Sequence, residues 1–329
     1  MEKEFFIGED DYKDRMNHEV KSFIDSKVKT AKLKTRDGKN IAYYYAIHPE
    51  SKGTIVMVHG FCEYFAKFHE LAYYFYQEGF SFYFMELRGH GHSDHDVPEK
   101  FSKVSTASFF DLRDDLKELL DRIVLPKVGK ENLYLYSHSM GGCISALFLE
   151  EYSEYFKKAV LSSPMLRISW NGLPMPVVKM LIWYKKRRRQ MDDYVPGAHD
   201  FDGKEEFETS SCMSRARYDK IMSDRKAYNG NQTYGGTYRW ADASLKGMKS
   251  AQKNAKKITT PIFLATAGSD NMVDNSGQDE FISHCQAIAK HKVYPGAKHE
   301  LYNATQEIRE EYIEDIFTFF LDSFGLLAH

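Results

Sequence analysis

The sequence is poor in cysteine and carries no excess of either charge. Four cysteines occur in 329 residues, and no two of them form a Cys-x-x-Cys pair, so the usual sequence signature of a zinc or redox site is missing. We expect these thiols to be free and buried in a reducing compartment. The formal net charge of −2 argues against general nucleic-acid binding.

Long apolar runs are also missing. No stretch approaches the ~20 consecutive apolar residues of a membrane-spanning helix, and residues 1–10 lack the apolar run of a secretory signal peptide. We therefore expect a cytoplasmic protein that contacts a membrane transiently, as a peripheral protein does. Hydrophobic residues nevertheless make up 43% of the chain and aromatic residues 15%, so a sizeable core is available.

One serine, Ser139, stands between a predicted strand and a predicted helix. The apolar run 133–136 predicts a buried strand, and the run 143–150 predicts a helix. A serine at such a junction is the nucleophile elbow of an α/β-hydrolase, where the turn is so tight that the flanking positions need small side chains. The residues around the turn are Ser137, His138, Gly141 and Gly142. The alternative interpretation is a glycine-rich helix start without chemistry.

An acidic residue and a histidine follow the serine in the order that this fold requires. The run 261–267 predicts a strand, and Asp270 comes soon after its end, where a carboxylate can orient a histidine. Asp274 is the alternative acid, although its position favours capping of the helix that begins after it. His299 lies between a predicted strand at 291–294 and the C-terminal helix, so it can reach the serine hydroxyl.

These residue types in this order predict acyl transfer to water. Ser139 attacks an acyl carbonyl, and His299 takes the hydroxyl proton and later returns it to the leaving group. The acid holds the imidazole and stabilises its protonated form. We expect this chemistry to need no metal ion and no organic cofactor.

The negative oxygen of the tetrahedral intermediate needs hydrogen-bond donors that are already in place. One donor is expected to be the backbone N–H of Met140, the residue after the nucleophile. The second should come from the loop after the predicted strand 54–58, and we assign it to the N–H of Phe61. His59 and Gly60 precede Phe61, and we expect them to shape this loop rather than to act as a base.

The alternation of strands and helices predicts an α/β fold with a mostly parallel central sheet flanked by helices. An Asp-Gly turn between two alternating runs predicts a leading hairpin. The predicted strands are 29–35, 41–47, 54–58, 80–85, 132–137, 159–161, 261–267 and 291–294, and the predicted helices before the elbow are 65–78 and 105–123. Residues 1–27 form either a loose lead-in or a short helix packed on the domain.

The alternation stops after residue 165 and returns near residue 261. An interruption at this point of the chain is where this fold inserts a cap over the site. We therefore expect a hydrolase core made of residues 1–165 and 246–329, with residues 166–245 as a cap, or lid.

The predicted cap contains an apolar run, 173–184, that leads directly into five basic residues, 185–189. One interpretation is a lipid-facing or membrane-facing element, in which Trp183 and its apolar neighbours meet acyl chains while the cations meet lipid phosphates. The candidate head-group contacts are Arg187, Arg188 and Arg189. The alternative is a cap helix with solvated charges at its C-terminal end. A nucleic-acid role for one short basic cluster is disfavoured by the net charge.

Four runs of sequence resemble the monoacylglycerol lipase and lysophospholipase branch of the α/β-hydrolases, and most of all its bacterial lysophospholipases. They are His59-Gly60-Phe61-x-Glu63, Leu87-Arg88-Gly89-His90-Gly91-His92-Ser93, His138-Ser139-Met140-Gly141-Gly142 and Gly296-Ala297-x-His299-Glu300. The similarity extends from about residue 30 to the C-terminus and implies a serine esterase for single-chain lipids. Two residues depart from the family pattern, Ser137 for a glycine or alanine and Glu86 for an aspartate, and neither departure removes a catalytic group.

The leading hypothesis is therefore a carboxylic-ester hydrolase for lysophospholipids or monoacylglycerols. The basic run 185–189 favours lysophospholipids, because a phosphate gains more than a glycerol from nearby arginines. A peptidase and an acyltransferase remain alternatives, since one fold supports several chemistries. A non-catalytic receptor would lack a triad member or the oxyanion-loop glycine. Dehalogenases and epoxide hydrolases of this fold carry an aspartate where this chain has Ser139.

Overall fold

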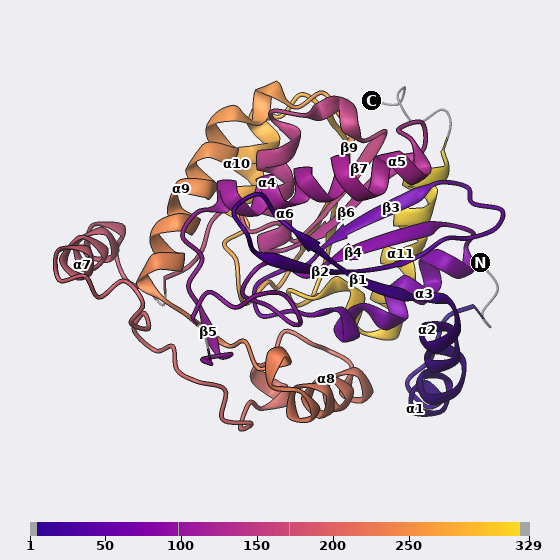
Figure 1. The fold of residues 1–329 in the computed structure, drawn as a ribbon, viewed down its shortest axis with the longest axis horizontal. Coiled ribbons are helices and arrows are strands. Elements are labelled where there is room, and N and C mark those ends of the chain that lie inside the picture. Colours follow the sequence, from indigo (N-terminus) through magenta and orange to yellow (C-terminus); the bar gives the residue numbers. More distant parts are fainter. Residues whose placement is uncertain (1–4, 98, 171, 323–329) are drawn as a thin grey trace.

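The computed structural model describes residues 5–97, 99–170 and 172–322, so the ends of the predicted core at 1–4 and 323–329 lie outside it. Its centre is an eight-stranded sheet in the order β1-β2-β4-β3-β6-β7-β9-β10 (Figure 1). The strands are β1 (Lys29–Lys34), β2 (Asn40–Ala46), β3 (Thr54–Val58), β4 (Ser81–Met85), β6 (Leu133–His138), β7 (Lys158–Ser162), β9 (Ile262–Ala267) and β10 (Ile288–Tyr294). β2 pairs antiparallel with β1 and β4, and the remaining neighbours are parallel.

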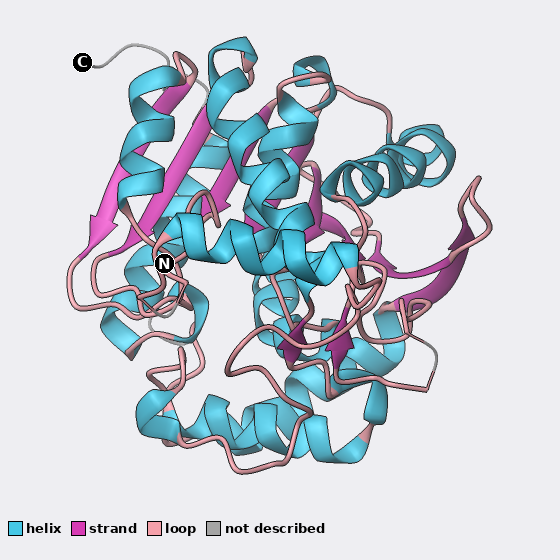
Figure 2. Ribbon diagram, turned by 90° about the vertical axis from the view of Figure 1, so that its left-hand side faces the viewer, coloured by secondary structure: helices cyan, strands magenta, loops and turns pink. Residues whose placement is uncertain are grey.

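Two layers of helices cover the two faces of this sheet (Figure 2). The helices are α1 (Tyr12–Arg15), α2 (Lys21–Lys27), α3 (His69–Gln77), α4 (Phe109–Leu119), α5 (Leu125–Val128), α6 (Met140–Leu149), α7 (Met175–Arg187), α8 (Arg215–Ala227), α9 (Tyr238–Asn254), α10 (Ser276–His284) and α11 (Gln306–Leu321). Val56 and Val58 of β3 pack in the cluster of α4, α6, α9 and α10, whereas Ile55 and Met57 pack with α3 and α11. Successive side chains of a strand point to opposite faces, so a central parallel strand must be apolar throughout.

Most predicted elements are present, with shifted ends. The predicted helix 65–78 begins as a 3-10 turn, Phe65–Phe68, before α3. The helix predicted from residue 105 begins at Phe109, because the Ser108 hydroxyl accepts a hydrogen bond from the N–H of Phe110 and caps α4. Strand β10 starts earlier than predicted, at Ile288.

Residues 12–27 are helical and packed on the domain, which favours the second of the two alternatives left by the sequence. α1 continues through a π-helical turn, Met16–Val20, into α2. Met16, Val20 and Phe23 are buried in the same cluster as α3 and α11.

Residues 166–245 add no strand to the eight-stranded sheet in the part of the chain that the structure describes. They carry α7, α8, the first half of α9 and the short strand β8 (Gly235–Gly236), which pairs with β5 (Lys103–Val104). α9 crosses the expected boundary at residue 245 and packs against α6, α4 and α10. In Figure 1, α7 projects from the left of the molecule and α8 lies below the sheet.

Candidate active site

Ser139 occupies a strained turn between β6 and α6. Its φ of 52° lies in a region that non-glycine residues seldom adopt, as expected for a nucleophile elbow. A Cβ on Gly141 would lie 2.3 Å from the Val58 carbonyl oxygen and 2.5 Å from that of His59, so this position accepts no side chain. Ser137 is fully buried, and its hydroxyl donates to the Val160 carbonyl oxygen at 3.2 Å, which explains how serine fits where the family pattern has a smaller residue.

The structure brings Ser139, His299 and Asp270 into one hydrogen-bonded chain. His299 Nε2 lies 2.8 Å from Ser139 Oγ, and His299 Nδ1 lies 2.7 Å from Asp270 Oδ2. A carboxylate can only accept, so Nδ1 carries the ring proton and Nε2 is free to accept the serine proton. Ser139 is 7% exposed and His299 5%, so both reacting groups are shielded from water.

The Asp270 carboxylate is held in its charged form. Its other oxygen accepts hydrogen bonds from the backbone N–H groups of Met272 (2.8 Å) and Val273 (2.9 Å). Burial raises the pKa of Asp270, but His299 and these two donors outweigh it and lower the pKa below its usual range. Asp274 points its carboxylate elsewhere, at the N–H (3.0 Å) and hydroxyl (2.6 Å) of Ser276, the first residue of α10.

The loop from His59 to Tyr64, called the oxyanion loop below, follows β3 and lies against Ser139. Two neutral histidines shape it. His59 links the Gly60 carbonyl oxygen (2.7 Å) to the N–H of Leu87 (2.9 Å), and His90 Nε2 accepts from the N–H of Cys62 at 3.2 Å. Both rings are fully buried, and burial lowers the pKa of each, so they stay uncharged.

The N–H groups of Phe61 and Met140 have no hydrogen-bond partner within the described parts of the chain. Trp240 of α9 packs on both residues: its ring lies 4.6 Å from that of Phe61, and its Nε1 donates to Met140 Sδ at 3.4 Å. The ring centre of Trp170 lies 6.5 Å from that of Trp240. An aromatic wall therefore borders the two candidate oxyanion donors.

A buried charge network supports this loop and was not predicted from the sequence. Glu63 accepts the N–H of Gly60 at 2.6 Å, binds Lys67 at 3.0 Å and accepts the hydroxyl of Tyr302. Lys67 also binds Glu300 at 2.6 Å. Burial raises the pKa of Glu63, but the Lys67 charge and the Tyr302 hydrogen bond, together with the nearby histidines, outweigh this and lower it. Glu63 and Glu300 fall within motif runs, so their place in a motif was a usable signal, whereas Lys67 and Tyr302 gave none.

The remaining predicted residues lie away from the hydrogen-bonded chain or play a supporting part. His138 packs its ring 4.8 Å from His299, and Gly142 packs against Pro164. Arg187, Arg188 and Arg189 are exposed at the C-terminal end of α7. The four cysteines are free and buried, as predicted.

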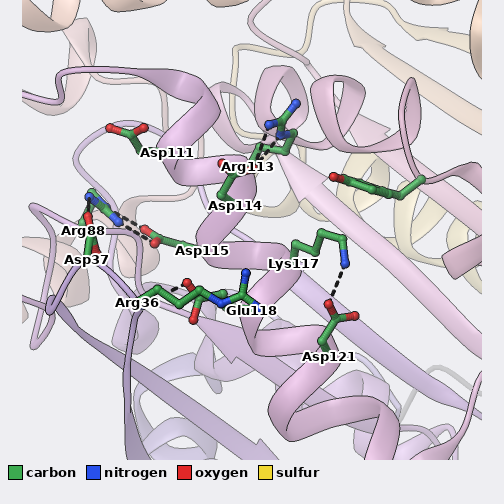
Figure 3. Close-up of a pocket in the computed structure, with 11 residues that line it drawn as sticks. Arg36, Asp37, Arg88, Asp111, Arg113, Asp114, Asp115, Lys117, Glu118 and Asp121 are labelled. Carbon is green, nitrogen blue, oxygen red and sulfur yellow. Dashed lines mark hydrogen bonds and ion pairs between the residues drawn. The ribbon is translucent and has the colours of Figure 1, made fainter.

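A charged hollow beside α4 shares no residue with this site (Figure 3). Arg88 bridges Asp115 (2.5 and 2.6 Å) and Asp37 (2.9 Å), and Lys117 binds Asp121 at 2.5 Å. Because these charges satisfy one another, we interpret the hollow as a structural ion-pair cluster. In residues 5–97, 99–170 and 172–322, no helix is both long enough and apolar enough to cross a membrane, and no three potential metal ligands cluster.

Comparison with known proteins finds relatives over most of the chain. Probable lysophospholipase L2 of Haemophilus influenzae is 28% identical over 282 residues, which cover 84% of this chain and 87% of that protein. Lysophospholipase L2 of Escherichia coli K12 is 27% identical over 81% of this chain and 79% of its own length. A soluble variant of the monoglyceride lipase of Saccharomyces cerevisiae superposes with a TM-score of 0.69 at 17% identity, covering 92% of this chain and 96% of that one.

A family model also covers most of the chain. The Hydrolase_4 family, described as serine aminopeptidase, S33, matches residues 49–306. This range contains the whole hydrogen-bonded chain and the oxyanion loop. The protein belongs to the Hydrolase_4 family, has the α/β-hydrolase fold and is a serine hydrolase of the lipase or esterase type.

Proposed function

We propose that the protein releases fatty acid from single-acyl lipids, with lysophospholipids as the preferred class. The observation that carries the proposal is the chain of hydrogen bonds from Ser139 through His299 to Asp270. Ser139 Oγ attacks the acyl carbonyl while His299 Nε2 takes its proton, and the same nitrogen then protonates the leaving oxygen. Water, activated by His299, hydrolyses the acyl-enzyme. Asp270 stabilises the imidazolium in both steps.

In this mechanism the N–H groups of Phe61 and Met140 bind the negative oxygen of the tetrahedral intermediate. Their unpaired state supports the assignment, since a donor already engaged elsewhere would have to break a hydrogen bond first. Trp240 packs against both residues, so the site is bordered by an aromatic surface whose one N–H is already engaged with Met140. Such a surface favours a substrate with an apolar acyl group, since it offers a polar group no hydrogen-bond partner. The two relatives named lysophospholipase L2 support the same substrate class.

Residues 166–245 act in the proposal as the cap over the site. They contribute no described strand to the main sheet and carry Trp170 and Trp240, which border the oxyanion donors. The near-complete burial of Ser139 supports a cover of this kind.

Helix α7 is the proposed membrane-facing part of the cap. Its exposed apolar side chains include Met180, Trp183 and Tyr184, with Trp183 61% exposed. Residues 166–191 contain seven lysines and arginines and no aspartate or glutamate. An apolar helix face bordered by cations favours binding to a surface of anionic lipid. The same cations favour a phosphate head group over a glycerol.

Amide hydrolysis is the second candidate, because the description of the matched family names an aminopeptidase. An aminopeptidase must bind the ammonium group of its substrate. The carboxylates beside the site, Glu63 and Glu300, are both paired with Lys67, which weakens them as partners for a second cation. This pairing favours the ester over the peptide.

The test measures labelling by a fluorophosphonate probe and fatty-acid release from lysophosphatidylethanolamine. Ser139→Ala is expected to lose both. Ser145→Ala is the matched control, because Ser145 is a fully buried serine of α6 whose hydroxyl has no partner among the described residues. Equal release by Ser139→Ala and the wild type would reject the proposal. Cleavage of an aminoacyl p-nitroanilide without release of fatty acid would replace it with the peptidase.

A further inference from the structure

The oxyanion loop is bound directly to helix α8, an element of the proposed cap. The hydroxyl of Tyr64 donates to the Ile221 carbonyl oxygen at 3.0 Å, and Arg225 Nη2 donates to the Cys62 carbonyl oxygen at 3.4 Å. Ile221 and Arg225 are four residues apart and therefore share one face of α8. The loop that carries the Phe61 N–H thus rests on this helix.

Cys62 is the strained point of the loop. Its φ of 59° lies in the left-handed region, which costs a non-glycine residue of order 1 kcal/mol or more. The strain is held from two sides: the Cys62 N–H donates to His90 Nε2 at 3.2 Å, and its carbonyl accepts from Arg225. Phe61 shares a peptide group with Cys62, so relaxation of Cys62 would turn the Phe61 backbone and redirect its N–H.

Arg225 is buried and held by an ion pair and two aromatic rings. It is 6% exposed, its Nη1 binds Glu205 Oε2 at 2.8 Å, and its guanidinium lies 5.4 Å and 5.8 Å from the ring centres of Phe201 and Tyr234. Its Nε has no hydrogen-bond partner among the residues described. An unpaired buried donor costs stability, so this arginine is poorly explained as a stabilising residue alone.

The opposite end of α8 is fixed to the core. Arg217 is 1% exposed and donates to both carboxylate oxygens of Glu70 in α3, at 2.6 and 2.9 Å. It also donates to the Ile7 carbonyl oxygen at 2.9 Å. Breaking a buried ion pair of this kind is strongly unfavourable. α8 is therefore anchored at both ends, unlike α7, which projects from the molecule (Figure 1).

We propose that Arg225 is a positioning residue of the oxyanion hole. By holding the Cys62 carbonyl it keeps the Phe61 N–H directed at the developing negative oxygen, and α8 serves as a fixed support of the site rather than as its moving lid. This inference rests on the serine-hydrolase mechanism of the proposed function, and it does not depend on which lipid is the substrate.

The test uses a soluble ester, p-nitrophenyl butyrate, and a trifluoromethyl ketone inhibitor that forms a tetrahedral adduct on serine. Removing an oxyanion donor outright costs about 10²–10³ in kcat, and a misdirected donor should cost less. Arg225→Met is expected to lower kcat by roughly tenfold, leave KM within about twofold and weaken the inhibitor by a factor similar to the kcat loss. Arg225→Lys should recover part of the loss, because a lysine can still donate to Cys62.

Arg217→Met is the matched control, since this equally buried arginine of the same helix does not contact the oxyanion loop. It should lower the thermal midpoint while keeping kcat and inhibitor affinity. If Arg225→Met behaves in the same way, Arg225 only stabilises the fold and the inference is wrong. Tyr64→Phe removes one hydroxyl and serves if Arg225→Met does not fold: an unchanged kcat would also overturn the inference. A wild-type protein inert to both reagents would instead overturn the proposed function.

Discussion

His299 Nε2 lies 2.8 Å from Ser139 Oγ although 160 positions separate the two residues in the chain. The order of the strands in the sheet brings the two residues together. Ser139 follows β6, Asp270 follows β9 and His299 follows β10, and these strands are parallel members of one sheet. The carboxyl ends of parallel strands meet at one edge, which is where α/β proteins place their sites.

The acid can be tested by comparing two aspartates. Asp270→Asn should reduce kcat by about 10³–10⁴, because the amide can no longer fix the His299 tautomer that leaves Nε2 free to accept a proton. Asp274→Asn should keep kcat within a few-fold and lower the free energy of unfolding by about 0.5–1 kcal/mol, since it weakens the hydrogen bonds to Ser276 at the start of α10. Kinetics on a soluble ester and urea unfolding separate the two, and the reverse order would make Asp274 the acid.

The positions of Ser139, Asp270 and His299 were predictable because each follows a short apolar run that reads as a strand. Because these strands are predicted to be parallel, their carboxyl ends meet at one edge of the sheet, so all three residues are expected there. The preference for Asp270 over Asp274 also came from local sequence, since Asp274 lies two residues before the start of a helix. Element ends were less predictable: α4 starts at its Ser108 cap rather than at Ser105, an equally good capping residue by sequence.

The contacts of the residues that support the oxyanion loop could not be predicted from local sequence. His90, Lys67 and Tyr302 reach the oxyanion loop or its network from separate elements. Trp240 arrives from a helix more than a hundred residues after the loop that it packs against. Lys67 and Tyr302 stand in none of the motif runs. His90 stands in the run 87–93, but that run does not show which group its side chain contacts, so these roles depend on tertiary packing.

The free energy of unfolding should decrease as the pH is lowered, because His138 is buried in its neutral form. Burial lowers the pKa of His138 to about 4, with Glu63 opposing the shift and His299 adding to it. In the unfolded chain a histidine has a pKa of about 6.5, so between these values the unfolded state binds a proton that the folded state does not. The stabilisation is fully present above pH 6.5 and decreases as the pH falls toward 4, by about 2 kcal/mol between pH 7.5 and 5.0. Because His59 and His90 are also buried with a lowered pKa, urea unfolding of the wild type and of a His138 variant at both pH values is needed to isolate this contribution.

His138→Gln provides the comparison, because it keeps a polar side chain without a titrating ring. Its free energy of unfolding should depend less steeply on pH by that amount. An identical pH dependence in wild type and variant would show that His138 is not the group responsible.

The elbow should tolerate no side chain at Gly141. In Gly141→Ala the new methyl would meet two backbone carbonyl oxygens, of Val58 and His59, which cannot move without displacing β3 and the oxyanion loop. We expect a loss of about 1–3 kcal/mol in the free energy of unfolding together with most of the esterase activity. Ser145→Ala on the same helix should change stability by less than about 0.5 kcal/mol. Wild-type activity in Gly141→Ala would contradict the described elbow.

The basic end of α7 can be tested by charge removal. Replacing Arg187, Arg188 and Arg189 with glutamine should lower the rate on lysophospholipid in anionic vesicles by tenfold or more, since each cation near such a surface contributes about 1 kcal/mol. A matched control replaces three exposed lysines of β1, namely Lys29, Lys32 and Lys34, and should have little effect. An unchanged rate on lysophospholipid in anionic vesicles would assign the three arginines to the solvated surface. Equal losses on lysophospholipid and monoacylglycerol would assign them to membrane binding and not to the phosphate head group.

The most direct test of the account is fatty-acid release from lysophosphatidylethanolamine and from monooleoylglycerol, measured side by side with purified protein and with Ser139→Ala as the blank. We expect the wild type to release fatty acid from both, faster from the phospholipid, and the Ser139→Ala blank to release none. Faster release from the monoacylglycerol would contradict the proposed head-group preference, and release by Ser139→Ala would contradict the site itself.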